Sequence, residues 1–285
     1  MRKPVVLLLG GPNSGKTHYA GQLYGRLQRK PGMLKLNSNQ TTPPNLSALG
    51  EVLGQLENGN SAEHTPSETW SEITLNLVDD QGQELQLNWP DYGGEQLKEV
   101  FKNREVPENW RNKLLNADGW FVLIRLSSET VYSDAIDKLK TGVGVAKSSS
   151  CQRAVNWDAN AYWIETFQIL KHVAGLDSIS SLTTPRLAIL LSCYDELTTT
   201  DQPPLEVLKA KLPLFESYLS STWHESAISI WGLSSLGKSL GSSTNDDDFI
   251  DEGPEYHGWV CTPDGKSNDG DLTKPLAWLL KNYDD

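Results

Sequence analysis

The stretch PVVLLLGGPNSGKT (residues 4–17) runs from a continuous apolar segment into a glycine-rich loop. A continuous apolar run is typical of a strand that is buried on both faces of a parallel sheet. After the loop, apolar side chains recur at helical spacing on one face: Tyr19, Ala20, Leu23, Tyr24 and Leu27. The order of strand, loop and helix predicts a phosphate cradle, and a strand-to-helix turn with a chance lysine is the alternative.

Residues 10–17 match the Walker A pattern, GxxxxGK followed by Ser or Thr. Its glycines let backbone N–H groups wrap a phosphate, and the following helix adds a favourable dipole. We expect Lys16 to reach the β- and γ-phosphates and the Thr17 hydroxyl to ligate Mg²⁺. The predicted nucleotide contacts in this segment are Gly10, Gly11, Pro12, Asn13, Ser14, Gly15, Lys16, Thr17 and His18.

Further elements follow from the same patterns. Continuous apolar runs predict buried strands at 119–126, 186–193 and 226–233. Alternating segments at 72–80 and 84–89 predict an antiparallel hairpin. Helices are predicted at 94–101, 107–116, 161–173, 205–211, 212–221 and 271–282, with a break at Pro213. The pattern predicts one α/β domain over residues 1–285, a three-layer P-loop sandwich whose six-stranded, mostly parallel sheet has one antiparallel hairpin strand.

Three segments exceed this minimal pattern. They are a polar, proline-containing loop at 31–68, an insert at 127–158, and residues 238–270. Loops of this length in a compact domain are usually functional or disordered. The last segment holds an acidic cluster at 246–252, for which we expect a solvated loop, with a cation site as the alternative.

Composition excludes several classes of function. The net charge of −12 and the pI of about 4.9 argue against direct binding to nucleic acid, which is itself a polyanion. Only three cysteines occur, without metal-site or disulfide-framework spacing, so a reducing, cytoplasmic location is expected. The first apolar run ends at Gly10, too short for a signal-peptide core or a membrane helix, and no membrane partner is expected.

A second motif follows the predicted hairpin. Residues 89–96 read WPDYGGEQ and contain Asp-x-x-Gly, which alone is only a surface turn. Combined with the Walker A loop, the sequence resembles the Ras-like P-loop GTPases of the translation-factor class. The resemblance implies that Asp91 holds Mg²⁺ through water and that the Gly94 amide binds the γ-phosphate of GTP.

The resemblance also implies a threonine ahead of the hairpin that senses the γ-phosphate and Mg²⁺. Thr65 and Thr69 are both candidates. With Gly82 taken as the turn glycine, the spacing from Thr69 to Asp91 resembles the Ras arrangement and favours Thr69, whereas Thr65 is freer to reach in from the loop. Either can instead be an ordinary loop or strand-edge residue.

Base recognition in these GTPases uses Asn/Thr-Lys-x-Asp after the fifth strand, and residues 192–195 here read SCYD. Asp195 is expected to accept hydrogen bonds from guanine N1 and N2, because adenine offers only an acceptor and a C–H there. Cys193 replaces the lysine whose stem covers the base. Asp195 as a cap of the following segment is the alternative. Ser234 and Ser235 stand where the family has a Ser-Ala-Lys motif, a weak match.

Hydrolysis needs an oriented water and neutralisation of charge on the transferred group. By resemblance, Glu95 stands where Ras-like enzymes have their water-positioning glutamine, so slow turnover is expected; a solvated helix-start acid is the alternative. Between residues 31 and 71 the only basic residue is Lys35, so no arginine is available there. The form GxPNxGKT resembles potassium-stimulated bacterial GTPases, which implies K⁺ on Asn13; a turn-bracing role is the alternative.

The sequence therefore predicts a Mg²⁺-dependent GTP/GDP switch that hydrolyses slowly and controls a protein effector or second GTPase through segments 31–71 and 91–110. The GGEQL continuation and the large inserts resemble bacterial double-GTPase or GTPase-associated-system proteins. A non-hydrolysing interaction module and an ATP-using P-loop protein are the alternatives. The predicted catalytic residues are Lys16, Glu95 and Asn13, and the predicted metal ligands are Thr17, Thr69, Thr65 and Asp91.

Overall fold

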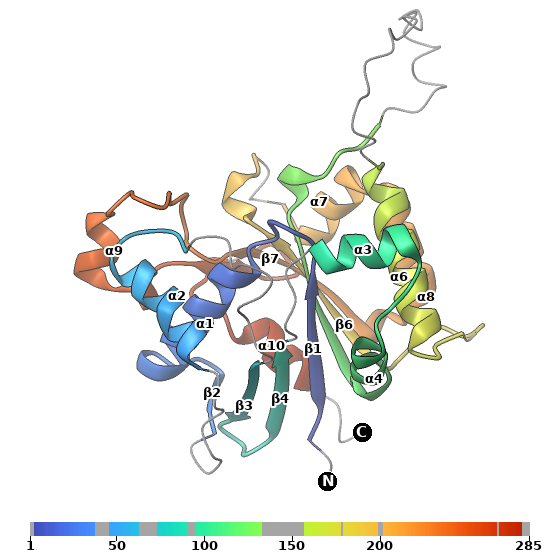
Figure 1. Ribbon diagram of the computed structural model, residues 1–285, viewed down its shortest axis with the longest axis horizontal. Coiled ribbons are helices and arrows are strands. Elements are labelled where there is room, and N and C mark those ends of the chain that lie inside the picture. The colour runs from blue at the N-terminus through green and yellow to red at the C-terminus, as the bar shows by residue number, and fades with distance from the viewer. Residues whose placement is uncertain are drawn as a thin grey trace, which may run out of the picture.

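The structure is a computed structural model that describes residues 3–37, 46–62, 73–89, 95–132, 157–177, 179–198, 202–266 and 268–280. Within these ranges one large sheet carries helices on both faces (Figure 1). Its strands are β1 (Val5–Gly10), β2 (Leu34–Leu36), β3 (Ile73–Asp79), β4 (Glu84–Trp89), β5 (Gly119–Ile124), β6 (Arg186–Ser192), β7 (Ile228–Ser234), β8 (Trp259–Cys261) and β9 (Asn268–Asp269).

The spatial order of the strands is β2-β3-β4-β1-β5-β6-β7-β8-β9. Strands β4, β1, β5, β6 and β7 are parallel, and β3 runs antiparallel to β4, which confirms the predicted α/β class and hairpin. The described chain has nine strands where the sequence predicts six. The additional β2, β8 and β9 contain only two or three residues each, too few to show a hydrophobic period.

The helices form the two outer layers. They are α1 (Lys16–Arg29), α2 (Ser47–Glu57), α3 (Glu95–Asn103), α4 (Glu108–Asn116), α6 (Ala159–Val173), α7 (Pro204–Lys211), α8 (Pro213–Thr222), α9 (Asp247–Glu252) and α10 (Lys274–Leu280). Single 3-10 turns are η1 (Leu126–Ser128), η2 (Tyr194–Glu196), η3 (Glu225–Ala227) and η4 (Pro254–Tyr256). Helices α3, α4, α6, α7 and α8 cover one face of the sheet, and α1, α2 and α10 cover the other.

Strand β5 shows why the sequence run is continuously apolar. Trp120, Val122 and Ile124 belong to the core under α6. Phe121 and Leu123 alternate with them and belong to the core under α1. Because both faces of the strand are buried, every position is apolar and the usual alternation is lost.

The predicted loop at 31–68 is partly wrong, because the structure places β2 and helix α2 within it. The helix buries a stripe with the spacing i, i+3, i+4 and i+7: Leu49, Val52, Leu53 and Leu56. This apolar stripe is present in the sequence, and the four positions between its members are polar or glycine. The helix forms because α1 offers it a matching surface.

Two glycines of α1 make that surface. A Cβ atom at Gly21 would lie 2.4 Å from Val52 Cγ1, and one at Gly25 would lie 2.8 Å from Leu53 Cδ1. Both distances are shorter than real side chains permit, so only glycine allows this close approach of α2. The helix that begins at the phosphate loop therefore rests directly on α2.

The break predicted at Pro213 is confirmed between α7 and α8. The first backbone N–H groups of a helix have no partner within it. Here the Asn160 side-chain oxygen accepts hydrogen bonds from the backbone N of Leu214 and of Phe215, each at 3.1 Å. Helix α6 thereby fixes the start of α8.

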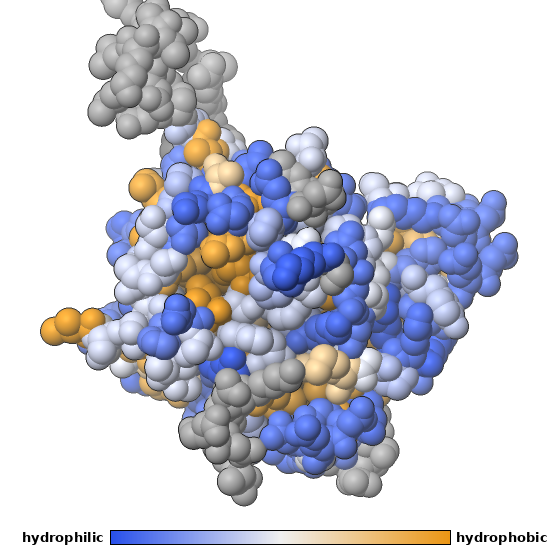
Figure 2. All heavy atoms as spheres, turned by 180° about the vertical axis from the view of Figure 1, so that it is seen from behind, coloured by the Kyte–Doolittle hydropathy of each residue, from blue (hydrophilic) through white to orange (hydrophobic). Residues whose placement is uncertain are grey.

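Residues 238–270 were expected to be a loop, but they include α9, β8 and β9. On the face shown in Figure 2, the end of the molecule that carries α9 is predominantly hydrophilic. The acidic residues of this segment thus lie on a structured, solvated surface. Of the insert 127–158, residues 133–156 lie outside the described ranges.

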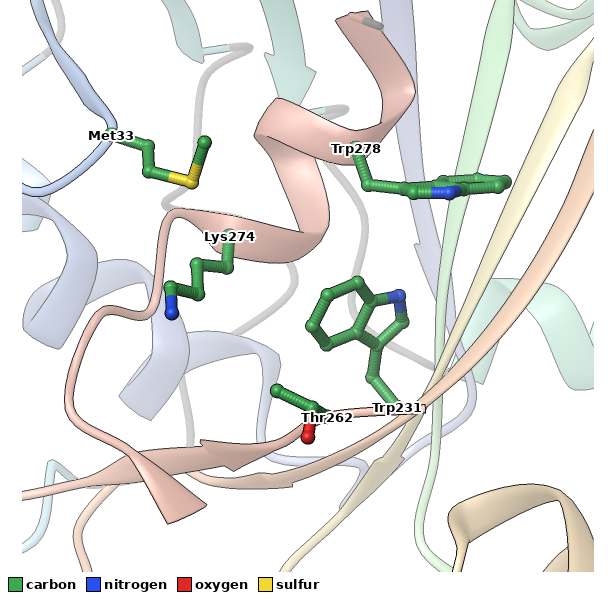
Figure 3. A pocket seen from close by; sticks show the side chains of 5 residues that line it. All are labelled: Met33, Trp231, Thr262, Lys274 and Trp278. Atoms are coloured by element: carbon green, nitrogen blue, oxygen red, sulfur yellow. The ribbon is translucent and has the colours of Figure 1, made fainter. Parts of the chain in front are cut away.

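A cavity of about 260 Å³ lies beside α10 (Figure 3). Its lining residues are Met33, Trp231, Thr262, Lys274 and Trp278. None of the predicted site residues belongs to this lining. The cavity is a packing feature between the segment after α1, the far strands of the sheet and α10.

Candidate functional site

The phosphate loop (residues 10–17) connects β1 to α1, and its backbone carbonyl groups bind the side chain of its own lysine, Lys16. Lys16 Nζ donates hydrogen bonds to the carbonyl oxygens of Gly10 at 2.7 Å and Gly11 at 2.6 Å. Ser14 Oγ donates to the same Gly11 oxygen at 2.7 Å. The ammonium group is therefore held inside the curve of the loop, where it can turn from carbonyl oxygens to a phosphate.

Two left-handed residues shape this loop. Gly15, with φ 76°, is the residue before α1, and Asn13 has φ 55°. Glycine adopts this conformation freely, and asparagine is among the residues that tolerate it best. The loop therefore ends with the backbone N–H groups at the start of α1 directed out of the helix, as an anion site requires.

The predicted base-recognition motif lies beside the phosphate loop. Strand β6 ends at Ser192, Cys193 follows with φ 50°, and η2 carries Asp195. A Cβ atom built on Gly15 would lie 3.9 Å from Cys193 Sγ, so the thiol packs against the end of the phosphate loop. We call residues 193–196 the base turn. The fold thus brings together two motifs that are far apart in the sequence.

Cys193 carries no charge at neutral pH. Burial raises the pKa of its thiol to about 11, and the nearby Arg125 opposes that shift without overcoming it. A neutral thiol cannot supply the positive charge that the lysine of the family's motif would bring.

A cation, Arg125, lies beside Cys193 between the two loops, and it was missed from the sequence. It follows β5 directly, and its Nη1 lies 3.5 Å from the backbone oxygen of Asn13. Its Nε donates to Glu196 Oε2 at 3.0 Å, and its Nη2 pairs with Glu196 Oε1. The one available signal was a charged residue that interrupts the apolar run of residues 119–126 at the edge where the predicted site lies.

Ser234 and Ser235 begin a second loop at the same edge. Ser234 ends β7 and is buried, and its Oγ accepts a hydrogen bond from Gly237 N at 2.9 Å. In the sheet register its neighbour Leu233 pairs with Ser192, the last residue of β6. This serine loop (residues 234–238) therefore lies next to the base turn.

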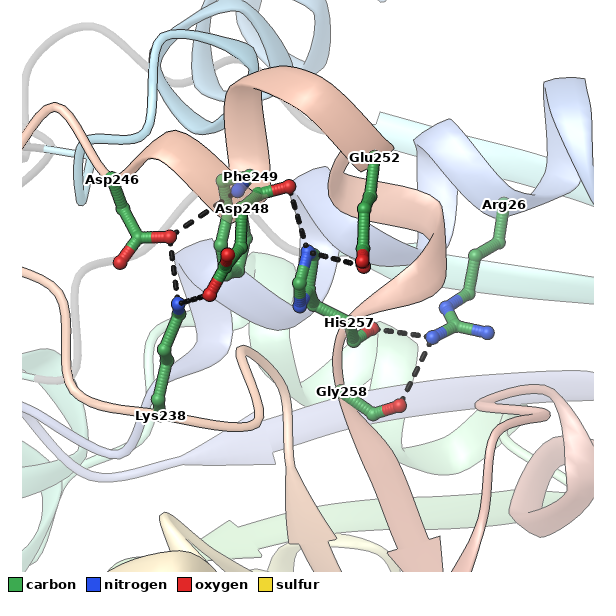
Figure 4. Close-up of polar contacts among 8 residues, drawn as sticks. All are labelled: Arg26, Lys238, Asp246, Asp248, Phe249, Glu252, His257 and Gly258. Atoms are coloured by element: carbon green, nitrogen blue, oxygen red, sulfur yellow. Dashed lines mark hydrogen bonds and ion pairs between the residues drawn. The ribbon is translucent and has the colours of Figure 1, made fainter.

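The acidic cluster braces the serine loop (Figure 4). Lys238 Nζ forms ion pairs with Asp246 at 2.7 Å and with Asp248 at 2.8 Å. Asp246 also caps α9, since its Oδ1 accepts from Phe249 N at 3.2 Å. Within the described ranges no group of three or more His, Cys, Asp or Glu side chains is placed to hold a metal ion. The acids therefore neutralise Lys238 and cap a helix.

Helix α1 contacts the segment after α9 through the side chain of Arg26. The buried Arg26 donates to the backbone oxygens of His257, Gly258 and Gly270, with 3.0 Å to Gly258. Burial lowers the pKa of the Arg26 guanidinium, and the carboxylate of Asp271 opposes the shift. His257 in turn stacks on Phe249 of α9, with ring centroids 4.0 Å apart.

Several predicted site residues cannot be placed. Thr65, Thr69, Asp91 and Gly94 lie outside the described residues. Glu95 is the first residue of α3, but its side chain is not described. Of the predicted Mg²⁺ ligands, only Thr17 is described; it lies half-buried in the first turn of α1, with His18 beside it.

Across the described chain, the search for membrane-spanning segments finds no helix with enough length and apolar character. A family model described as Double-GTPase 1 matches residues 7–279. The search of curated proteins returns no significant match.

Among solved structures, the chain is similar to the Ski7 GTPase-like domain of S. cerevisiae bound to GDP and inorganic phosphate, with 17% identity and a TM-score of 0.39. That match covers 82% of this chain and 43% of the other, so the chain spans less than half of the Ski7 structure. The Arl6 BBS3 small GTPase of Trypanosoma brucei matches with 13% identity and a TM-score of 0.38, over 82% of this chain and 88% of that one.

Proposed function

Because the chain belongs to the Double-GTPase 1 family, we propose that it is a guanine-nucleotide switch that hydrolyses GTP slowly and signals to a partner protein. The observation that carries the proposal is the juxtaposition at Gly15. There the phosphate loop, with Lys16 held inside it, packs against the Cys193 thiol of the base turn. A nucleotide fits such a site with its phosphates on the loop and its base at Asp195.

In this proposal the nucleotide contacts are spread over three segments. The phosphates lie on residues 10–18, with Lys16 on the β- and γ-phosphates and the Gly94 amide on the γ-phosphate. Asp195 accepts hydrogen bonds from guanine, while Ser234 and Ser235 line the neighbouring loop. The fixed positions of both loops relative to β6 and β7 favour this assignment.

The donor set fits Mg²⁺ as far as it is described. Thr17 offers a hydroxyl oxygen in the first turn of α1, and oxygen ligands are those that Mg²⁺ prefers. Asp91 and Thr69, or Thr65, would complete the set. When bound, the ion would neutralise phosphate charge; the chain's own contribution is to orient the phosphates on the loop and to place Lys16 beside them.

Slow hydrolysis follows from the charges near the γ-phosphate. Glu95 is the proposed water-positioning residue, and its carboxylate would face a negatively charged phosphate. Asn13 is exposed on the phosphate loop, which allows its side chain to face a bound K⁺. We therefore propose that turnover is faster with K⁺ than with Na⁺.

The proposed switch uses parts of segments 31–71 and 91–110. Helix α2 belongs to the fixed part of the molecule, because it packs closely on Gly21 and Gly25 of α1. The chain after it is also tied down: Ser61 N donates to Gly241 O at 2.9 Å. The nucleotide-dependent change is thereby restricted to residues outside 46–62.

The test is phosphate release by the purified full chain with GTP and with ATP, each in K⁺ and in Na⁺ and with Mg²⁺ present. A Lys16→Ala preparation purified in parallel measures contaminating phosphatase. We expect slow release from GTP, little from ATP, and none above background for Lys16→Ala. Equal rates in the two salts would remove K⁺ from the proposal.

A second candidate function is a nucleotide-binding interaction module without hydrolysis. The carboxylate at Glu95 and the lack of arginine between residues 31 and 71 favour it. Tight GTP binding without phosphate release in either salt would select this candidate. A preference for ATP would instead overturn the role of Asp195.

A further inference from the structure

Arg125 connects the two halves of the candidate site through every nitrogen of its guanidinium group. Nη1 lies 3.5 Å from the Asn13 carbonyl oxygen of the phosphate loop. Nε and Nη2 fork onto the two carboxylate oxygens of Glu196, the last residue of the base turn. Ser127 Oγ contacts both partners. A planar group held along its whole edge has one fixed orientation.

The Arg125–Glu196 pair is stable at neutral pH. Partial burial opposes ionisation of Glu196, but hydrogen bonds from Arg125 and Ser127 outweigh it and lower the pKa of this carboxylate. The hydrogen bond to Glu196 likewise raises the pKa of Arg125. Both groups stay charged throughout the physiological range, so the connection does not depend on pH there.

Arg125 places a positive charge beside the neutral thiol of Cys193. Asp195 is close enough for its charge to act on the Arg125 guanidinium. The Arg125 side chain keeps 32% of its surface exposed, so a ligand at Asp195 can reach it. Arginine combines an apolar stem with a flat cation, and both pack well on the face of an aromatic ring.

We propose that Arg125 is a base-binding residue that covers one face of the nucleotide base and, through Glu196, fixes Asp195 relative to the phosphate loop. The inference rests on the proposed guanine-nucleotide function. It assigns to a residue after β5 a task that the neutral Cys193, after β6, cannot perform. Glu196 is a positioning residue in this scheme, because it acts on the nucleotide only through Arg125.

The experiment distinguishes the contribution of the base to nucleotide affinity from the contribution of the phosphates. Isothermal titration calorimetry on the full chain measures the affinity for GDP and for inorganic tripolyphosphate, which has no base. The variants are Arg125→Ala, Arg125→Lys, Glu196→Gln and the double variant Arg125→Ala/Glu196→Gln. Arg104→Ala is the matched control, because Arg104 also pairs with a carboxylate, donating from Nε and Nη2 to one oxygen of Glu165 on an exposed surface.

We expect Arg125→Ala to weaken GDP binding about tenfold or more while tripolyphosphate binding changes less than about twofold. Arg125→Lys should recover part of the loss, since the stem and charge remain. Glu196→Gln should weaken GDP binding less than Arg125→Ala, and the double variant should be no weaker than Arg125→Ala alone, because the two side chains act as one unit. Arg104→Ala should bind both ligands as the unaltered chain does.

Equal weakening of GDP and tripolyphosphate by Arg125→Ala would show an effect on the phosphate loop alone and would overturn the base-covering role. Unchanged GDP binding by Arg125→Ala would overturn the inference and leave the proposed function standing. Failure of the unaltered chain to bind GDP or GTP would overturn the proposed function itself. If Arg125→Ala does not fold, Arg125→Lys and Glu196→Gln decide, because full GDP affinity in both contradicts the inference.

Discussion

The phosphate loop and the base turn lie side by side but are built in opposite ways. The phosphate loop is one contiguous segment, and the hydrogen bonds described for Lys16, to Gly10, Gly11 and Ser14, lie within it; Arg125 adds one contact from outside, to the Asn13 carbonyl oxygen. The base turn depends on partners far away in the sequence, such as Arg125, 71 residues before Glu196. The conformation of a contiguous site is determined largely by its own residues, whereas a distributed site forms only when the surrounding sheet is folded.

The largest expected effect on GDP affinity comes from a substitution in the phosphate loop. Lys16→Ala should weaken GDP binding roughly 100-fold, about 2.7 kcal/mol, because it removes the charge inside the phosphate loop. Thermal stability should change little, because the hydrogen bonds of Lys16 Nζ to Gly10 and Gly11 hold a loop and not the core of the sheet. Calorimetric titration with GDP checks this, with Lys30→Ala at the far end of α1 as control. A large loss of stability in Lys16→Ala would show that the loop is not self-contained.

The support beneath the phosphate loop gives the next effect. Gly21→Ala should lower the free energy of unfolding by about 1–3 kcal/mol, because the new methyl group collides with Val52. Gly54→Ala in α2 is the matched control: its Cβ would meet nothing within 4 Å, and helix propensity should raise stability by about 0.5–1 kcal/mol. Urea denaturation of both variants measures the difference. Equal free energies of unfolding for Gly21→Ala and Gly54→Ala would mean that α2 does not pack closely on α1 at Gly21.

In the base turn, Asp195→Asn should lower the preference for GDP over ADP about tenfold, because an amide cannot accept hydrogen bonds from both guanine donors. Thermal melting should be unaffected, as Asp195 lies half-buried at the surface of η2. Competition titrations with GDP and ADP provide the ratio. An unchanged ratio would place base recognition away from the base turn.

The smallest expected effect concerns the brace of the serine loop. Lys238→Ala should leave stability unchanged within error and weaken GDP binding by at most about twofold, because its ion pairs are exposed to solvent and screened by salt. The same titrations in low and high salt check this. A difference that persists in high salt would show that Lys238 contacts the nucleotide.

The sequence was informative where a pattern is local. The apolar run at 119–126 predicted β5, observed at Gly119–Ile124, because burial on both faces leaves a run without interruptions. Helix α2 was missed although its apolar stripe is present in residues 47–57, because the polar, proline-containing segment around it was interpreted as a loop; the glycine surface of α1 on which it packs is not visible in residues 47–57 themselves. Strands β8 and β9 are too short to carry a period of their own.

The candidate site divides in the same way. The order and identity of residues 10–17 predicted a strand-loop-helix cradle, and that local structure is confirmed. Arg125 could not be assigned from the sequence, because its partners Asn13 and Glu196 become neighbours only through the parallel alignment of β1, β5 and β6. The roles of Thr65, Thr69, Asp91 and Gly94 stay predictions.

The contacts of Arg26 set a lower limit on the length of the functional unit. Arg26 is buried in the last turn of α1, and the backbone oxygens described as its acceptors come from residues 257, 258 and 270. A shortened chain that ended before residue 257 would keep the phosphate loop but would remove these acceptors from a buried cation, which is strongly destabilising. A fragment that carries the candidate site is therefore expected to fold only if the late strands β8 and β9 are expressed with it.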